Sequence, residues 1–308
     1  MTQPLQPNLL GLAMAPAEAI VQRDKIMLVE HAVARAALTH AMQDADVLEK
    51  FCSTYRAWID SSRLNSFQGL DQFGTAAYSS GTSEAFDKFY MKHHHRRFRC
   101  FQGEYLYHRL TWQRSFDWAV MTDGADIAVN DAVVVSVPFA DTGNVPKELT
   151  TAFLDRCAEL GVPVLIDCAF FGICGNIKFD FGHSAITDVC FSLSKSFPVN
   201  LLRIGIRFTR TDDSDSLLVY HKSQYVNRLG AAVGLALLAT QSPDHEFEQW
   251  RARQLEFCQQ MQLEPSNTVI FGIDCDHRYD QYNRGSVDTN RICFSRYFES
   301  GVLPNVGQ

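Results

Sequence analysis

The chain has 308 residues, of which 46% are apolar and 20% are charged, and its formal net charge is −7. This composition is typical of a globular protein with a large core, and its acidic balance argues against nucleic acid as a partner. No segment approaches the roughly 18 consecutive apolar residues of a membrane span, so we expect no membrane partner. The first residues lack the basic region and long apolar run of a secretory signal.

The nine cysteines include no CxxC pair, and most stand among apolar residues. We therefore expect reduced thiols in the core of a cytoplasmic protein. His93, His94 and His95 form a triplet before Arg96 and Arg97, at the expected end of a helix. Because adjacent helical residues point in different directions, the triplet does not predict a metal site.

The first half of the chain begins with helical periodicity, from residue 16 to about residue 60. A polar, glycine-containing stretch at 61–79 is typical of a loop, and a helix is expected at 82–95. Short apolar runs then follow at 98–101, 132–137, 163–168, 188–193 and 203–208. These runs lack polar alternation, which favours strands buried on both faces of a parallel sheet.

An amphipathic helix is predicted at 146–161, because Pro146 stands at its start and Gly161 at its end. Its position between two strand-like runs indicates an α/β fold. Later come a helical stretch at 215–262 with a break at Ser242-Pro243, and strand-like runs at 267–273 and 290–295. We expect a large domain at 66–244 and a small α+β domain formed by 1–65 and 245–308.

The segment CFSLSKSF places Lys195 just after a predicted strand. Ligands of open α/β sheets collect at the carboxyl ends of strands, where a lysine of lowered pKa can form a Schiff base. Arg203 supplies a nearby cation and a guanidinium fork that matches a phosphate. Ser192 and Ser194 add hydroxyl donors.

Three further segments have residues suited to a flat, phosphorylated cofactor. Asp167 closes the strand of LIDCAFFG, where its carboxylate would keep a pyridine nitrogen protonated. Ser80, Gly81 and Thr82 precede a predicted helix, whose N–H groups suit an anion. Tyr105 in QGEYLYH offers a ring for stacking.

Each feature taken singly also has a purely structural explanation. Lys195 suits a surface lysine, Asp167 a turn cap, the Ser-Gly-Thr segment a helix N-cap and Tyr105 a core aromatic. Cys168 and Cys174 lie close to the proposed site and are expected to be packing residues.

In this order, these motifs resemble fold-type I pyridoxal-phosphate enzymes of the class I/II aminotransferase family, over about residues 75 to 210. The resemblance implies a three-layer α/β/α sandwich with a mostly parallel sheet, a reduced small domain and a homodimer. It implies that Lys195 holds pyridoxal 5'-phosphate as a Schiff base and that Asp167 pairs with the pyridine nitrogen. The other cofactor-binding residues that it implies are Ser80, Gly81, Thr82, Tyr105, Phe170, Ser192, Ser194 and Arg203. Arg291 in NRICFS resembles the arginine that binds the substrate carboxylate.

The chain departs from the family at two positions. Ala140 in VPFADTG stands where an asparagine normally donates to the cofactor's phenolic oxygen, and Phe170 replaces a tyrosine that supplies a second donor. Asp141 or a water are candidates to substitute. The resemblance favours an aminotransferase that acts on an α-amino acid. The two departures keep lyase, racemase or other Cα or Cβ chemistry as the alternative. A catalytically silent binding protein on the same scaffold is a third possibility, which the intact Lys195 disfavours.

Overall fold

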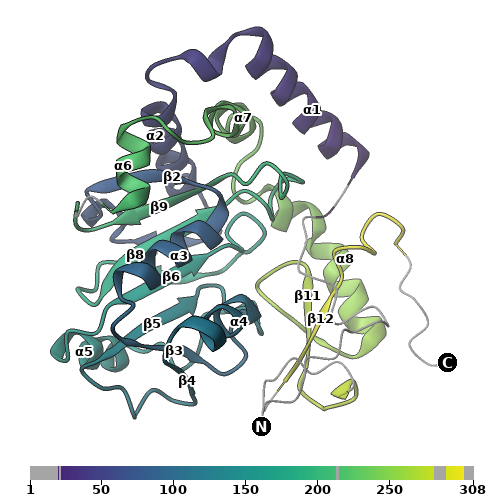
Figure 1. The fold of residues 1–308 in the computed structure, drawn as a ribbon. Helices are drawn as coiled ribbons and strands as arrows, with labels where there is room; N and C mark the ends of the chain where they lie inside the picture. The colour runs from purple at the N-terminus through teal and green to yellow at the C-terminus, as the bar shows by residue number, and fades with distance from the viewer. Residues whose placement is uncertain (1–19, 21, 213–214, 281–288, 302–308) are drawn as a thin grey trace.

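The computed structural model describes residues 20, 22–212, 215–280 and 289–301. A large sheet with helices on both sides lies beside a smaller part that contains α8 (His245–Met261), β11 (Phe271–Asp274) and β12 (Asn290–Cys293) (Figure 1). The predicted helix from residue 16 begins outside the described residues, which include α1 (Arg23–Leu38).

The large sheet has seven strands in the order β2-β9-β8-β6-β5-β3-β4. Their bounds are β2 Thr75–Ser79, β9 Gly205–Thr209, β8 Ile186–Ser192, β6 Val164–Cys168, β5 Asp131–Ser136, β3 Arg97–Phe101 and β4 Trp118–Met121. Only β9 runs opposite in direction to the other six strands, so the predicted mostly parallel sheet is confirmed. Every residue of β5, β6 and β9 is buried, which explains why β5 and β6 lack polar alternation.

Helices cover both faces of this sheet and complete the three layers. One face packs on α3 (Gly81–Lys92) and α4 (Leu106–Ser115), through an apolar cluster that includes Phe89, Trp112 and Val134. The other face shares a cluster with α2 (Val47–Asp60), α5 (Thr151–Glu159) and α7 (Arg228–Leu238). Burying each large apolar side chain contributes about 1.5–3 kcal/mol. The predicted α/β/α sandwich is confirmed.

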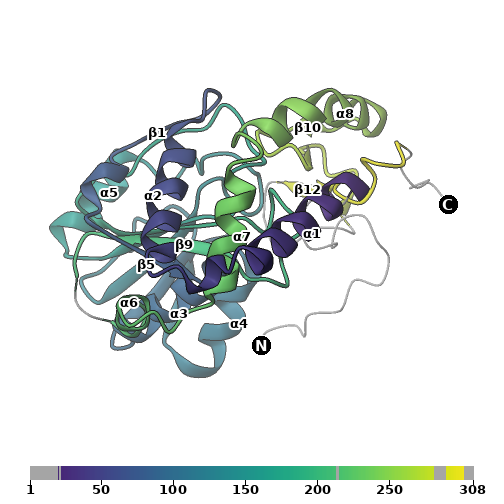
Figure 2. The same cartoon turned by 90° about the horizontal axis from the view of Figure 1, so that it is seen from above.

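The expectation of one helical stretch at 16–60 is wrong in its middle, where the chain turns between α1 and α2. His40 has a left-handed φ of 50° and precedes the short 3₁₀ turn Ala41–Gln43. The Thr39 hydroxyl donates to the Arg35 carbonyl oxygen at 2.8 Å. This turn lets α1 cross over and pack against α7 (Figure 2).

Three other expected boundaries differ. The stretch 61–79 contains β1 (Ser66–Gln68), which pairs with β7 (Lys178–Asp180), and the edge strand β2. The helix α5 begins after Thr150, whose hydroxyl accepts from Phe153 N at 3.1 Å, and not at Pro146. The stretch 215–262 forms three helices, α6 (Ser216–Lys222), α7 and α8 (His245–Met261).

The smaller part is an antiparallel sheet of β10 (Glu264–Pro265), β11 (Phe271–Asp274) and β12 (Asn290–Cys293). Its apolar cluster joins α8 and also contains Ile20 from the N-terminal region. Buried residues of α1 and α2 belong instead to the cluster of the large sheet. The division of the chain at residues 65 and 244 stays a prediction.

Candidate active site

The predicted site residues meet at one edge of the large sheet, where its parallel strands end. Asp167, the last residue but one of β6, pairs with Cys190 of β8, and Lys195 lies in the turn after Ser192, where β8 ends. In the neighbouring registers, Ser192 pairs with Gly205, and Gly205 pairs with Ser79. The lysine, the aspartate and the start of α3 therefore come together from distant parts of the chain.

The start of α3 and Arg203 form one unit, which we call the anion loop (residues 80–83 and Arg203). An Nη2–O distance of 3.0 Å joins Arg203 to the Ser80 carbonyl oxygen, and the same nitrogen lies 3.2 Å from Ser83 Oγ. Gly81 has a φ of 74°, and a Cβ built there would come within 2.7 Å of Arg203 Nη2. Only glycine leaves the guanidinium in this place without displacement.

The first turn of α3 keeps N–H groups available for an anion. Ser80 is the N-cap residue, yet its side chain makes no capping hydrogen bond. Its own backbone N–H donates instead to Glu84 Oε2 at 2.7 Å. The helix N-terminus, the exposed Arg203 and the buried Thr82 thus combine positive potential with hydroxyl and N–H donors.

The serines that flank Lys195 are buried and bonded to one another. Ser192 Oγ donates to Ser194 Oγ at 3.0 Å, and Ser194 N donates to Ser192 Oγ at 3.2 Å. A further contact of 3.3 Å links Ser192 Oγ to the Ile204 carbonyl oxygen, close to Arg203. These bonds fix the turn from which Lys195 projects.

The carboxyl group of Asp167 is buried, and its pKa is strongly raised. Burial raises the pKa of Asp167 to about 8, and the nearby charge of Glu104 adds to the rise. A backbone hydrogen bond from Ala169 N, at 2.9 Å, and the positive charge of Lys195 oppose that rise. A buried carboxyl in this state accepts a cationic partner readily, since such a partner relieves the cost of ionisation.

Tyr105 is the N-cap residue of α4, with 44% of its surface exposed. Its ring stacks on Tyr107 at 6.0 Å and meets the edge of His108 at 5.8 Å. The His108 imidazole is fully buried and hydrogen-bonded to the Tyr90 hydroxyl, and burial lowers its pKa to about 3. A buried, neutral imidazole therefore packs against the exposed tyrosine ring.

The two departures from the family pattern lie beside Arg291, in β12. Arg291 is buried; it donates to the Ala140 carbonyl oxygen and lies 4.3 Å from the centre of the Phe271 ring. Phe170 meets the same Phe271 ring edge-on at 5.2 Å. Ala140 and Phe170 are thus occupied in holding Arg291 and its aromatic support.

Asp141, the candidate substitute for the absent donors, is tied to the small sheet. The Thr289 hydroxyl donates to Asp141 Oδ2 at 3.2 Å. The turn that follows is held by Ser266 Oγ, which donates to the Thr142 carbonyl oxygen at 2.7 Å. These contacts hold Asp141 against the small sheet, and its part as a substitute donor stays a prediction.

Sequence reasoning missed Glu104, a fully buried carboxylate next to Tyr105. It accepts from the backbone N–H of Tyr105 and from both the N–H and the hydroxyl of Ser136. The signal in the sequence is weak, because a glutamate after Gln102-Gly103 is typical of an exposed turn. Glu104 lies near the site because it is bonded to Ser136, and Ser136 of β5 pairs with Asp167 of β6 in the sheet.

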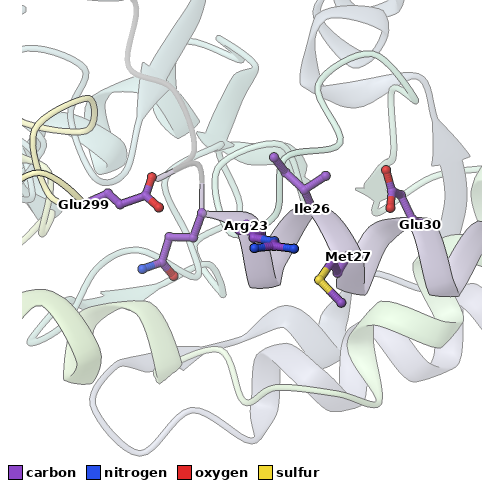
Figure 3. Close-up of a pocket in the computed structure, with 6 residues that line it drawn as sticks. Arg23, Ile26, Met27, Glu30 and Glu299 are labelled. Carbon is purple, nitrogen blue, oxygen red and sulfur yellow. The ribbon is translucent and has the colours of Figure 1, made fainter.

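A pocket of about 530 Å³ lies elsewhere, at the start of α1 (Figure 3). Its lining residues are Gln22, Arg23, Ile26, Met27, Glu30 and Glu299, none of which is a predicted site residue. Within the described ranges, no group of three His, Cys, Asp or Glu side chains is arranged to hold a metal ion. Over the same residues, no helix is both long and apolar enough to cross a membrane.

The structure was compared with known proteins. No protein-family model and no curated protein matches the sequence. A Thermus thermophilus aspartate aminotransferase double mutant superposes with a TM-score of 0.70 at 15% identity, over 94% of this chain and 88% of that one. The histidinol-phosphate aminotransferase of Clostridium acetobutylicum gives 0.63 at 12% identity, over 91% and 93%. The PLP-bound C-S lyase of Staphylococcus hominis gives 0.68 at 11% identity, over 94% and 88%. This chain therefore has the fold of the fold-type I pyridoxal-phosphate enzymes of the aminotransferase class.

Proposed function

We propose that this chain is a pyridoxal-phosphate-dependent enzyme that acts on an α-amino acid through a Schiff base on Lys195. One observation carries the proposal: the anion loop, Lys195 and the buried Asp167 lie at the same edge of the sheet. The donor set fits the cofactor. The anion loop, with Ser192 and Ser194, suits a phosphate, and Asp167 suits a protonated pyridine nitrogen.

Each residue then has a distinct task. When bound, the cofactor supplies an electron-withdrawing ring that stabilises negative charge at the substrate's Cα. Lys195 Nζ takes the proton from that carbon as general base. Asp167 would hold the proton of the ring nitrogen, and the exposed ring of Tyr105 would be available to stack on the cofactor. Arg291 binds the substrate carboxylate through its guanidinium fork.

The central test is covalent trapping. The purified chain is mixed with pyridoxal 5'-phosphate, reduced with borohydride, digested and examined by mass spectrometry. We expect the modified lysine to be Lys195, and we expect the Lys195→Ala protein to lose the visible absorption of the bound cofactor. Lys147→Ala, which removes an exposed lysine, serves as the control. Modification spread evenly over surface lysines would contradict the proposal.

For the reaction type we propose transamination, supported by the likeness to aminotransferases in fold. The second candidate is lyase, racemase or other Cα or Cβ chemistry, favoured by Ala140 and Phe170, which remove two expected donors to the phenolic oxygen. A panel of amino acids separates the two. Release of a 2-oxo acid with conversion of the cofactor to its amine form indicates transamination. Other products with the cofactor unchanged indicate the second candidate.

We also propose a homodimer in the cytoplasm. Leu201, close in sequence to Arg203, is 89% exposed, and Tyr225 is 79% exposed, which suits a surface that a second copy covers. The nine cysteines are all free thiols, eight of them buried, as expected for a reducing compartment. Sedimentation at several concentrations tests the dimer, and fractionation of the producing cell tests the location.

A further inference from the structure

Glu104 is a buried carboxylate to which the preceding reaction scheme gives no task. It is 3% exposed and receives three hydrogen bonds. Oε1 accepts from Tyr105 N at 2.7 Å and from Ser136 Oγ at 2.5 Å, and Oε2 accepts from Ser136 N at 2.7 Å. A carboxylate buried this deeply is costly to maintain, and three donors offset much of that cost.

The bonds from Glu104 lead in two directions. The first reaches the backbone of Tyr105, which is the N-cap residue of α4 and carries the exposed ring. The second runs through Ser136, whose hydroxyl accepts from Ala140 N at 2.8 Å while it donates to Glu104. The Ala140 carbonyl oxygen in turn accepts from Arg291.

Glu104 also stands beside Asp167. Ser136 is the register partner of Asp167 in the β5–β6 pair, and Val137 N donates to the Asp167 carbonyl oxygen at 2.9 Å. The ionisable groups whose charges interact with Glu104 are Asp141, Asp167 and Cys100. Its negative charge therefore adds to the field that holds protons on Asp167 or on a ring nitrogen bonded to it.

We propose that Glu104 is a positioning residue for two separate parts of the site, Tyr105 and Arg291. It fixes the ring of the first through a backbone bond and the guanidinium of the second through Ser136 and Ala140. Its negative charge also favours the protonated form of Asp167, or of a ring nitrogen bonded to it. This inference rests on the proposed function, because it assigns Glu104 its task around the same cofactor and substrate.

The test uses the full chain and its Glu104→Gln, Glu104→Asp and Ser136→Ala variants. Three quantities are measured: the dissociation constant of pyridoxal 5'-phosphate, the pH at which the visible absorption of the bound cofactor is lost, and the dissociation constant of maleate. Maleate is a carboxylate probe that has no amine to react.

For Glu104→Gln we expect about tenfold weaker binding of pyridoxal phosphate and of maleate, and loss of the visible band at lower pH, because a negative charge has gone. Ser136→Ala keeps that charge, so only maleate binding should weaken, by about fivefold. Glu104→Asp keeps the charge on a shorter side chain. The visible absorption should then be lost at the wild-type pH, while at least one of the two affinities, for pyridoxal phosphate or for maleate, stays below that of the wild type. This last variant keeps the test decisive if the Gln protein does not fold.

Asp188→Asn is the matched control, because Asp188 is a buried carboxylate in β8 whose charged partner is Arg207. It should lower the melting temperature and leave all three quantities unchanged. If Asp188→Asn changes them as Glu104→Gln does, or if Glu104→Gln equals the wild type, the positioning role is overturned. If the wild-type chain itself does not bind pyridoxal phosphate, the proposed function fails first and this inference falls with it.

Discussion

Lys25 in α1 and Glu246 in the first turn of α8 form an ion pair in which both side chains are buried. Lys25 Nζ also lies 3.4 Å from the carbonyl oxygen of Ser196, the residue that follows Lys195. Burial lowers the pKa of Lys25 and raises the pKa of Glu246, while each charge partly compensates the other. The pair therefore joins the N-terminal helix to the smaller part of the fold, next to the candidate lysine.

The first prediction concerns this pair. Glu246→Gln leaves a buried ammonium without its counter-ion, so the free energy of unfolding at pH 7 should fall by about 3–5 kcal/mol. Glu248→Gln is the control, since Glu248 pairs with Arg63 at an exposed position, where about 0–1 kcal/mol is expected. Urea unfolding measures both. Equal losses in the two variants would refute a special role for the buried pair.

The second prediction concerns the cofactor-free protein and Asp167. Its pKa is raised from 3.8 to about 8 in the folded state, so the folded protein binds more protons than the unfolded chain between these values. The contribution of Asp167 to the free energy of unfolding therefore falls as the pH rises between these two values, by no more than about 1.4 kcal/mol per pH unit. Asp167→Asn should flatten this slope in denaturant unfolding measured from pH 5 to pH 8. An unchanged slope would show that Asp167 is ionised in the free protein.

The third prediction separates backbone strain from anion binding. Gly81→Ala should weaken pyridoxal-phosphate binding at least about tenfold, because its Cβ would displace the Arg203 guanidinium. Gly161→Ala is matched in strain, with a φ of 63°, but its Cβ would meet no atom within 4 Å. Both should lose about 1–2 kcal/mol of stability. Absorbance titration with the cofactor should distinguish them, and equal affinities would argue against the anion loop.

The fourth prediction concerns the missing donor. Phe170→Tyr places a hydroxyl at the position where the family has one, and a hydrogen bond to a charged acceptor is worth about 1.5–3 kcal/mol. The pH at which the bound cofactor loses its visible absorption should therefore fall by about one unit or more. Spectra recorded across the pH range check this shift. Phe171→Tyr, in the neighbouring buried position, should leave the transition in place.

The sheet could be predicted from the sequence because its strands are buried on both faces. The runs around Val134, Ile166 and Val189 are predominantly apolar, and each forms a strand of the parallel part of the sheet. The sequence does not predict the edge strand β2, because its residues TAAYS are mostly small or polar and its place is decided by pairing with β9, far along the chain. The turn at His40 was missed because alanine and leucine continue the helical composition on both sides of it.

The same distinction applies to the candidate site. Ser80, Asp167, Lys195 and Arg203 stand in recognisable local patterns, and the structure brings all four to one edge of the sheet. Ala140 contacts Arg291 through its backbone carbonyl oxygen, and the type of a residue does not predict the contacts of its backbone. Glu104 likewise depends on a neighbour more than thirty positions away. Contacts of this kind arise from register and tertiary packing rather than from local composition.

The pairing of β2 with β9 bears on how the chain acquires its site during synthesis. Ser79 leaves the ribosome about 126 residues before its register partner Gly205. Throughout that interval the nascent chain carries the serine, glycine and threonine of the anion loop without the arginine that completes it. If this loop binds phosphate as proposed, that affinity would arise only after β9 has inserted between β2 and β8, and pairing over such a separation is intrinsically slow. A cofactor that binds this loop would therefore bind only chains in which β9 is already paired with β2 and β8.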